Sequence, residues 1–327
     1  MGAPRVDGLP SGFTLPSCVP HVPALQTLNL SGSICALATP FRVADDALDL
    51  DAFGRLIDYQ LDAGTRGLVV AGSTGEGAAL ESAEFVKLLG FALQRVRRRL
   101  PVLAGTGLQS TRKTVAQTRL AADAGADLAL VVAPAYVRPT QEGLYRHYVE
   151  VAEHGGLPVL LYNVPSRTAC DILPATVERL CAHPNIVGIK EARVEPERMR
   201  ELLALKSGGF CILSGDDPTC ARAILEGADG VISVAANVAP AQMQYLCTLA
   251  AGGRENDART ADEALRGLYE LLGVEPNPIP LKWCLQRMGL GADHLRLPLV
   301  PLSAAYHAQG ESVLAGLGSD PSPPSRG

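Results

Sequence analysis

Lysine is scarce in this chain, and one lysine occupies an unusual position. Only five of the 29 lysines and arginines are lysines, and Lys190 directly follows the apolar run 186–189. A strand over that run would place the ammonium group of Lys190 in a buried position at the end of the strand. Burial lowers the proton affinity of an amine. An uncharged amine is the nucleophile that forms an imine with a carbonyl substrate. Position alone also allows a structural ion pair, although Glu191 is a poor partner because adjacent strand residues face opposite sides.

Further polar side chains stand at the ends of other apolar runs. Tyr162 ends the run 159–162 and could relay protons, and Arg167 follows in the next loop, where it could bind a carboxylate through two parallel hydrogen bonds. Tyr136 comes shortly after the run 128–132. Each has an ordinary alternative, since a tyrosine can pack at the edge of a core or loop and an arginine can lie in solvent. Taken one at a time, the ordinary roles are favoured.

A glycine-rich segment, Gly72-Ser73-Thr74-Gly75-Glu76-Gly77, follows the apolar run 67–71. Small residues allow backbone N–H groups to approach an anion closely. The segment lacks the Gly-Lys-Ser/Thr of a phosphate-binding loop, so a carboxylate would suit it as well as a phosphate. A tight turn between a strand and a helix would also account for it.

Histidines and cysteines give little sign of a metal site or of another nucleophile. The six histidines form no spaced cluster, and none stands at the end of an apolar run, which argues against metal-assisted chemistry and against a serine or cysteine triad. The eight cysteines contain no C-x-x-C pair, and several lie inside apolar runs. We therefore expect no metal, and buried reduced thiols typical of a cytoplasmic protein.

Composition excludes several classes of protein. The chain has 327 residues, 47% of them hydrophobic, and a formal net charge of −5, which excludes a largely disordered protein. Its 34 acidic residues outnumber the 29 basic ones, so no broad basic surface is expected and nucleic acid is not an expected partner. No secretory signal pattern and no apolar run of membrane length is found, so we expect a cytoplasmic protein without membrane segments.

The elements that must position these side chains alternate along the chain. Short apolar runs, typical of strands buried on both faces, are separated by segments with helical periodicity such as 50–63 and 82–96. The runs cover residues 34–39, 67–71, 102–104, 128–132, 159–162, 187–190, 211–213 and 230–234. Eight such units predict an α/β protein, a closed (β/α)8 TIM barrel with additional C-terminal helices. An open doubly wound sheet is the alternative, but 36–41 is not the dinucleotide-binding turn it would require.

The same pattern predicts the organisation of the chain. We expect the barrel over 31–240, a C-terminal helical region over 241–310, and two disordered ends, 1–30 and 311–327, that are rich in proline, glycine and serine. In such a barrel the chemistry belongs at the carboxyl ends of the strands. Lys190, Tyr162, Tyr136 and the segment 72–77 all stand at predicted strand ends.

Together these motifs resemble the dihydrodipicolinate synthase family, whose members are pyruvate aldolases that work through a lysine imine. The resemblance extends over roughly 32–302. It is carried by 32–41, 72–76, 104–107 and 138–145, by 161–168 with its Asn-Val-Pro-Ser-Arg-Thr run, by Gly188-Ile189-Lys190-Glu191-Ala192, and by 214–217, 230–234 and 275–280.

The resemblance implies an activity and a role for each site residue. Lys190 would form an imine with pyruvate, and the derived enamine would attack aspartate 4-semialdehyde, as in 4-hydroxy-tetrahydrodipicolinate synthesis for lysine and diaminopimelate. Tyr162 would shuttle protons, hydrogen-bonded to Thr74 and Tyr136. Ser73, where the family commonly has threonine, and Thr74 would hold the pyruvate carboxylate. The remaining binding groups would be Arg167 for the semialdehyde carboxylate and the backbones of Gly215 and Ile232.

The resemblance also carries implications for cofactors and partners. No organic cofactor or catalytic metal would be needed. The residue matching Tyr136 enters the site from a neighbouring subunit in this family, which implies a dimer at least and a homotetramer as the usual form. A sibling aldolase, such as an N-acetylneuraminate lyase or a 2-keto-3-deoxy sugar-acid aldolase, shares the lysine, the tyrosine and the glycine-rich loop. Arg167 favours the synthase, since a polyhydroxylated acceptor has no need of it. A non-catalytic barrel is the alternative from another class, and the intact set of site residues argues against it.

One departure from the family bears on regulation. Lysine-inhibited members line a subunit-interface site with histidine, asparagine, glutamate and tyrosine. The matching positions here are Ser82, Phe85, Gln109, Lys113 and Ala135. A lysine in place of a carboxylate repels the ammonium group of an incoming lysine, so weak or absent feedback inhibition is expected.

Overall fold

The computed structural model describes residues 30–317, which form a closed barrel of parallel strands. Neighbours in sequence are neighbours in the barrel, and β8 returns to pair with β1. The strands are β1 (Gly32–Ala36), β2 (Gly67–Val70), β3 (Val102–Gly105), β4 (Leu128–Val132), β5 (Val159–Asn163), β6 (Ile186–Glu191), β7 (Cys211–Ser214) and β8 (Gly230–Ser233). Each overlaps a predicted apolar run, although β1 begins two residues and ends three residues earlier than its run, so the predicted TIM barrel is confirmed.

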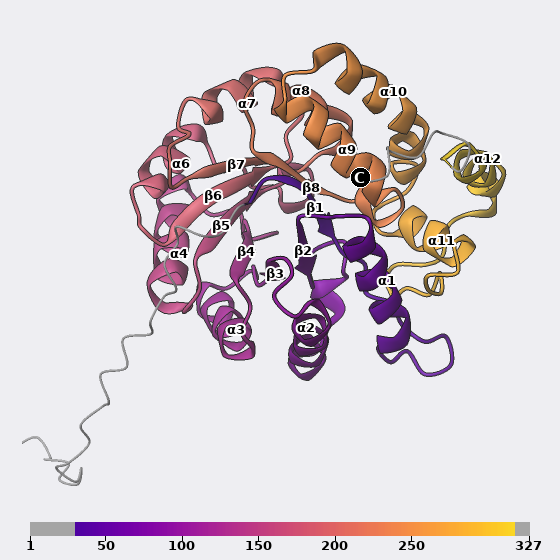
Figure 1. The fold of residues 1–327 in the computed structure, drawn as a ribbon. Helices are drawn as coiled ribbons and strands as arrows, with labels where there is room; N and C mark the ends of the chain where they lie inside the picture. Colours follow the sequence, from indigo (N-terminus) through magenta and orange to yellow (C-terminus); the bar gives the residue numbers. More distant parts are fainter. Residues whose placement is uncertain (1–29, 318–327) are drawn as a thin grey trace, which may run out of the picture.

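Helices surround the strands in a ring (Figure 1). The ring contains α1 (Leu50–Asp62), α2 (Ser82–Val96), α3 (Thr111–Ala124), α4 (Gln141–His154), the short α5 (Pro165–Thr168), α6 (Pro174–Cys181), α7 (Pro196–Leu203), α8 (Asp217–Leu225) and α9 (Pro240–Ala251). Short 3-10 turns stand at η2 (Gly77–Ala79), η3 (Ala235–Asn237) and η4 (Ala304–Tyr306). Glycines end three of the predicted units: Gly64, Gly125 and Gly227 all have a positive φ, which glycine adopts without steric cost.

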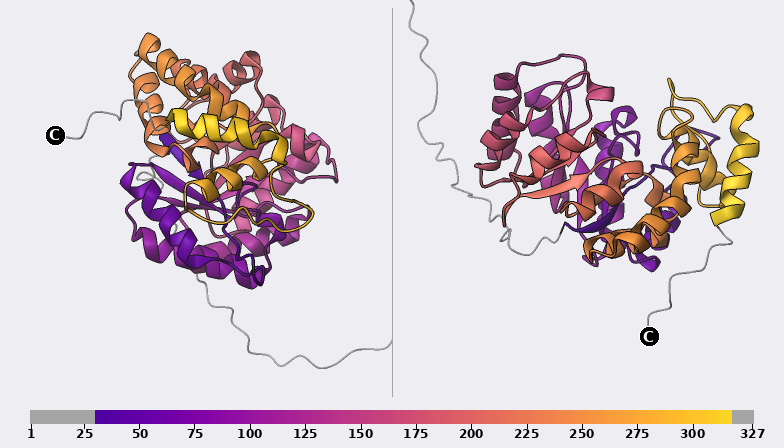
Figure 2. Two further views of the ribbon diagram at one scale, coloured as in Figure 1. Left: turned by 90° about the vertical axis from the view of Figure 1, so that its right-hand side faces the viewer. Right: turned by 90° about the horizontal axis from the view of Figure 1, so that it is seen from above.

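The C-terminal helices α10 (Glu255–Leu272), α11 (Ile279–Arg287) and α12 (His307–Leu317) gather on one flank of the barrel (Figure 2). The expected boundary at 240 falls before α9, which packs against α8 and β1 and is therefore the eighth barrel helix. No described helix has the length and hydropathy needed to cross a membrane.

Part of the expected disordered tail is a helix. Residues 311–317 belong to α12, because Val313, Leu314 and Leu317 pack against the core and Gly310 lies against the ring of Trp283. The local composition is rich in small residues and does not reveal that support. The rest of the expected tail, 318–327, and residues 1–29 of the expected N-terminal extension lie outside the described residues.

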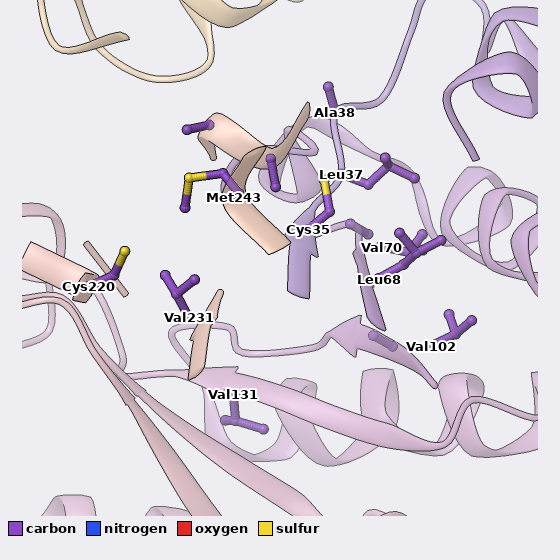
Figure 3. Close-up of a cluster of buried hydrophobic side chains, with 14 of the residues drawn as sticks. Cys35, Leu37, Ala38, Leu68, Val70, Val102, Val131, Cys220, Val231 and Met243 are labelled. Atoms are coloured by element: carbon purple, nitrogen blue, oxygen red, sulfur yellow. The ribbon is translucent and has the colours of Figure 1, made fainter. Parts of the chain in front are cut away.

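Two apolar layers hold the strands in place. Side chains such as Ile34, Val69, Leu103 and Leu160 fill the barrel interior, and side chains of opposite parity pack between the strands and the helices. Figure 3 shows part of this outer layer, including Cys35, Leu68, Val70 and Val231. The described cysteines are all free; five of them are buried as expected, whereas Cys181 and Cys211 are only partly buried, and Cys18 lies outside the described residues.

Candidate active site

The carboxyl ends of the strands enclose a cavity of about 180 Å³. Its wall brings together most of the residues singled out from the sequence: Ser73, Thr74, Tyr162, Arg167, Lys190 and Gly215. A second cavity of about 470 Å³ adjoins the first, since Ser73, Tyr162 and Arg167 line both, and it extends to Gln109 and Ala135. Residues from four different strand ends thus meet in one concave space.

Lys190 lies near the end of β6 with only 5% of its surface exposed. The register of β5 and β6 pairs it with Tyr162, and Nζ lies 4.2 Å from the centroid of the tyrosine ring. Glu191, by contrast, faces the opposite side of the strand and bonds to other residues. The ion pair between neighbours is therefore absent, and the amine stands against an aromatic face above an apolar interior.

A β-bulge sets the direction of Lys190. The register between β5 and β6 shifts at Val159/Leu160, so that Leu160 lies opposite Gly188 rather than opposite Val187. Val187 points to the barrel interior and Ile189 to the outer layer, which strict alternation would not allow. The extra residue reverses the phase of the strand and turns Lys190 inward, as bulges near active sites commonly do.

Two glycines make room around this strand end. A Cβ on Gly215 would lie 2.9 Å from Cε and 3.0 Å from Cγ of Lys190. A Cβ on Gly188 would lie 2.4 Å from the carbonyl oxygen of Cys211. Gly215 therefore lets the backbone after β7 approach the stem of the lysine, and Gly188 allows the close pairing of β6 with β7.

The glycine-rich segment forms a compact loop above β2. The Thr39 hydroxyl donates to the carbonyl oxygen of Gly75 at 2.7 Å, and a Cβ on Gly77 would lie 2.1 Å from the carbonyl oxygen of Ala71. Ser73 is exposed to the cavity and Thr74 is buried. Backbone groups and a free hydroxyl at such a loop can hold a carboxylate.

The expected hydrogen bond between Tyr162 and Thr74 is not formed. The Thr74 hydroxyl instead accepts a hydrogen bond from Nδ2 of Asn277 at 2.9 Å, and within residues 30–317 the Tyr162 hydroxyl has no hydrogen-bond partner. Arg167 donates through Nη2 to the backbone oxygen of Asn277 at 3.2 Å. Asn277 therefore joins the loop of Thr74 to Arg167 at the mouth of the cavity.

Asn277 was missed as a site residue because it follows no barrel strand. It enters from the segment between α10 and α11, to which the strand-end rule does not apply. Asp216, which also lines the cavity, was missed as well. Burial raises the pKa of the Asp216 carboxyl, which accepts a hydrogen bond from the Thr219 hydroxyl at 2.7 Å. The only sequence signal for either residue was its place in a motif shared with the family.

Two predicted residues lie away from the cavity. Ile232 fills the barrel interior below it, and Val234, two residues later, lines the wall instead. Tyr136 is 90% exposed on the loop after β4 and reaches neither cavity of its own chain. Its φ of 73° lies in the left-handed region, which is unfavourable for a bulky side chain and is common at functional sites.

A buried ion pair supports the glycine-rich loop from behind. Glu76 pairs with Lys282 of α11, whose side chain is only 1% exposed, and Oε2 of Glu76 accepts a hydrogen bond from the backbone N–H of Arg296 at 3.1 Å. Lys282 also donates to the backbone oxygen of His294 at 2.9 Å. Burial lowers the pKa of Lys282. The C-terminal helical region thus holds the loop that carries Ser73 and Thr74.

These side chains can perform imine chemistry on a small anionic carbonyl compound. The amine of Lys190 supplies the nucleophile, the phenol of Tyr162 a proton donor and acceptor, and the guanidinium of Arg167 a partner for a carboxylate. The space is large enough for a three-carbon acid beside a second small substrate.

Comparison with known proteins agrees with this geometry. The dihydrodipicolinate synthetase family model matches residues 29–316. The 4-hydroxy-tetrahydrodipicolinate synthase of Xanthomonas axonopodis pv. citri is 57% identical over 288 residues, which cover 88% of this chain and 95% of that protein. The enzyme of the same name from Stenotrophomonas maltophilia (strain K279a) is 56% identical over 286 residues, which cover 88% and 96%.

Solved structures show the same fold. The chloride-inhibited dihydrodipicolinate synthase of Acinetobacter baumannii, complexed with pyruvate, superposes with a TM-score of 0.86 at 41% identity and covers 88% of this chain and 99% of its own. The enzyme of Thermotoga maritima gives a TM-score of 0.87 at 40% identity, covering 89% and 99%. The barrel, the lysine at the end of β6 and these similarities agree, and the chain belongs to the dihydrodipicolinate synthase family.

Proposed function

We propose that this protein condenses pyruvate with L-aspartate 4-semialdehyde to form 4-hydroxy-tetrahydrodipicolinate. The observation that carries the proposal is the buried amine of Lys190 beside Tyr162 in a cavity that also holds Arg167. The names of the related enzymes support the choice of substrates. The pathway is that of lysine and diaminopimelate, and the free cysteines fit a cytoplasmic location.

The proposed steps use this chain's own groups. The Lys190 amine attacks the carbonyl carbon of pyruvate, and water leaves to give the imine. Loss of a methyl proton gives the enamine, whose carbon bonds to the aldehyde carbon of the semialdehyde. The amino group of the semialdehyde then attacks the imine carbon, closes the ring and displaces Lys190. Tyr162 carries protons between these groups, and no metal or organic cofactor takes part.

Substrate binding is assigned to the cavity wall. Ser73 and Thr74 bind the pyruvate carboxylate, and Arg167 binds the carboxylate of the semialdehyde. Gly215 brings backbone close to the imine. At β8 the proposed backbone contact shifts from Ile232 toward Val234, because Val234 is the residue on the wall.

We propose that the working form is a homotetramer built from dimers. Tyr136 supports this assembly, because it is almost fully exposed and lines neither of the two cavities described within residues 30–317. In a dimer its phenol would reach the neighbouring cavity and complete the proton relay with Tyr162. A monomeric variant is known among structurally similar dihydrodipicolinate synthases, so the assembly differs among relatives.

The choice of acceptor can be tested at Arg167. We expect Arg167→Met to lower kcat/KM for aspartate semialdehyde by about 10- to 100-fold, because a charge-assisted pair with a carboxylate is lost. Trapping of pyruvate on Lys190 with borohydride should continue at nearly the original rate. Arg119→Met is the matched control, because Arg119 is exposed on α3, lines neither cavity and donates to the backbone oxygen of His154. A wild-type enzyme that cleaves N-acetylneuraminate or a keto-deoxy sugar acid faster than it condenses the semialdehyde contradicts the proposal.

Feedback by lysine is expected to be weak. The larger cavity extends to Gln109 and Ala135, Lys113 is exposed on α3, and Phe85 is buried in the core, so this region offers an incoming amino acid no carboxylate at the matched positions. Lysine added to the assay at millimolar concentration should leave the initial rate nearly unchanged. Half-inhibition at sub-millimolar lysine would refute this expectation.

A further inference from the structure

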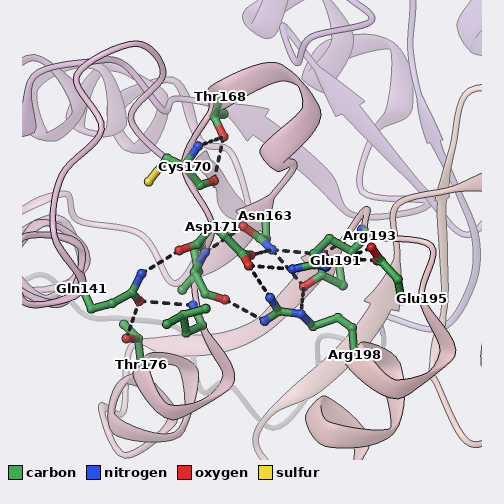
Figure 4. Close-up of polar contacts among 12 residues, drawn as sticks. Gln141, Asn163, Thr168, Cys170, Asp171, Thr176, Glu191, Arg193, Glu195 and Arg198 are labelled. Atoms are coloured by element: carbon green, nitrogen blue, oxygen red, sulfur yellow. Dashed lines mark hydrogen bonds and ion pairs between the residues drawn. The ribbon is translucent and has the colours of Figure 1, made fainter.

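A buried polar pair lies directly behind the two central site residues. Asn163 follows Tyr162 on β5 and Glu191 follows Lys190 on β6, and the strand register pairs Asn163 with Glu191 just as it pairs Tyr162 with Lys190. Because side chains alternate along a strand, Asn163 and Glu191 point away from the cavity toward the helices. Both are fully buried. Figure 4 shows how they meet.

Both the nitrogen and the oxygen of the Asn163 side-chain amide form hydrogen bonds. Its Nδ2 donates to Oε1 and Oε2 of Glu191, each at 3.0 Å, and to Oδ1 of Asp171 at 2.8 Å. Its Oδ1 accepts from the backbone N–H of Ile172 at 3.0 Å. The pair therefore ties β5 to β6 and also holds the segment that follows α5, the helix that carries Arg167.

Charged groups from several elements surround Glu191. From the loop after β6, the backbone N–H of Arg193 donates to Oε1 at 2.9 Å, while its guanidinium pairs with Asp171 at 2.8 Å and with Glu195 at 2.9 Å. From α7, Nε of Arg198 lies 4.0 Å from Oε2 of Glu191, and its Nη2 pairs with Asp171. Burial raises the pKa of Glu191 to about 7.

Packing alone does not call for such a pair. Leu161 and Ile189, on the same outer faces of the same strands, are apolar and fully buried. A carboxylate in that layer loses its hydration and is tolerated only when its hydrogen bonds are complete. The benefit of the pair lies in the directionality of its hydrogen bonds, which fix the spacing of the two strand ends more narrowly than apolar contacts do.

We propose that Asn163 and Glu191 are positioning residues that hold the Lys190 amine at its working distance from Tyr162. The proposal rests on the proposed imine chemistry of Lys190. The residues touch neither substrate nor amine, and they act through the strand ends on which Lys190 and Tyr162 stand. A misplacement of about 1 Å at a reacting group can lower a rate by about 100-fold.

The ionisation of Glu191 gives the proposal a signature. An ionised Glu191 only accepts hydrogen bonds and suits the donors of Asn163 and Arg193. A protonated Glu191 presents an O–H that competes with those donors, so the pair loosens as the pH falls through about 7. Glu191→Gln places a permanent donor there and imitates the protonated form at every pH.

The test measures imine formation by borohydride trapping with pyruvate, together with kcat and KM, from about pH 6 to about pH 9. We expect Glu191→Gln to trap pyruvate about 10-fold more slowly than wild type at the alkaline end and at nearly the wild-type rate at the acid end. The pyruvate KM should change little. Asp229→Asn is the matched control, because its carboxylate accepts from the Ile212 N–H at the opposite end of the barrel.

A second variant guards against a folding defect. Asn163→Ser removes the donors to Glu191 and should slow trapping most at the alkaline end, where wild type keeps the pair intact, with melting temperature measured for each protein. A folded variant of either kind whose trapping rate follows wild type across the whole pH range overturns the positioning role. Absence of any adduct on wild-type Lys190 instead overturns the proposed function, so the two failures are distinguishable.

Discussion

Lys190→Met is expected to lower turnover by about 10⁴-fold or more and to abolish the trapped pyruvate adduct. The amine is the only group in the described cavity wall that can form an imine, and removing the nucleophile of a covalent mechanism typically costs this much. Methionine preserves most of the aliphatic stem, which lies beside Gly215. The fold should therefore persist, and the loss should appear in kcat.

The measurement is mass mapping of peptides after borohydride reduction in the presence of pyruvate. Lys87→Met, on the exposed face of α2, is the control and should retain both the adduct and the activity. Unchanged turnover in a folded Lys190→Met protein would exclude the imine mechanism. Absence of an adduct in wild type would favour a non-catalytic barrel or a different keto acid.

Lys282→Met should destabilise the protein by about 3–5 kcal/mol, because it leaves the Glu76 carboxylate buried without its partner. Activity should fall as well, since Glu76 belongs to the loop that carries Ser73 and Thr74. Chemical denaturation gives the free energy of unfolding, and assays at low temperature separate the catalytic effect from unfolding.

The double variant Glu76→Gln with Lys282→Met is the decisive control. It removes both charges, so most of the lost stability should return even though the ion pair is gone. Lys206→Met, which loses a partly exposed ion pair with Asp229, should cost about 1 kcal/mol or less. A cost below about 1 kcal/mol for Lys282→Met would show that Glu76 finds another partner.

The barrel could be predicted because every strand is a short apolar run and every unit ends at a turn. The same pattern could not fix the phase of β6. An uninterrupted apolar run has no alternation of apolar and polar residues that would show which side faces inward. The bulge near Val187 that turns Lys190 inward lies in the pairing of β6 with β5, a separate segment of the sequence. The prediction that Lys190 faces the cavity was therefore right for a reason that the sequence pattern does not contain.

The site was predictable where it follows strand ends and not where it depends on distant segments. Asn277 and Lys282 reach the glycine-rich loop from beyond the eighth strand, across about 200 residues of chain. In the sequence, Asn163 and Glu191 look like ordinary residues at the ends of two strands. Only the register of β5 with β6 shows that they are neighbours. Tyr136 shows the opposite case, since a predicted site residue lies outside its own cavity.

The dependence of the loop on Lys282 has a consequence for biosynthesis. A ribosome releases the amino-terminal half first, so Glu76 and the outer edge of β1 emerge long before the segments that cover them, α11 and β8. During that interval the carboxylate stays hydrated and β1 presents unpaired backbone groups, which makes the partial chain prone to pairing with others. Catalytic competence therefore arises late, after α11 has left the exit tunnel and Lys282 has paired with Glu76.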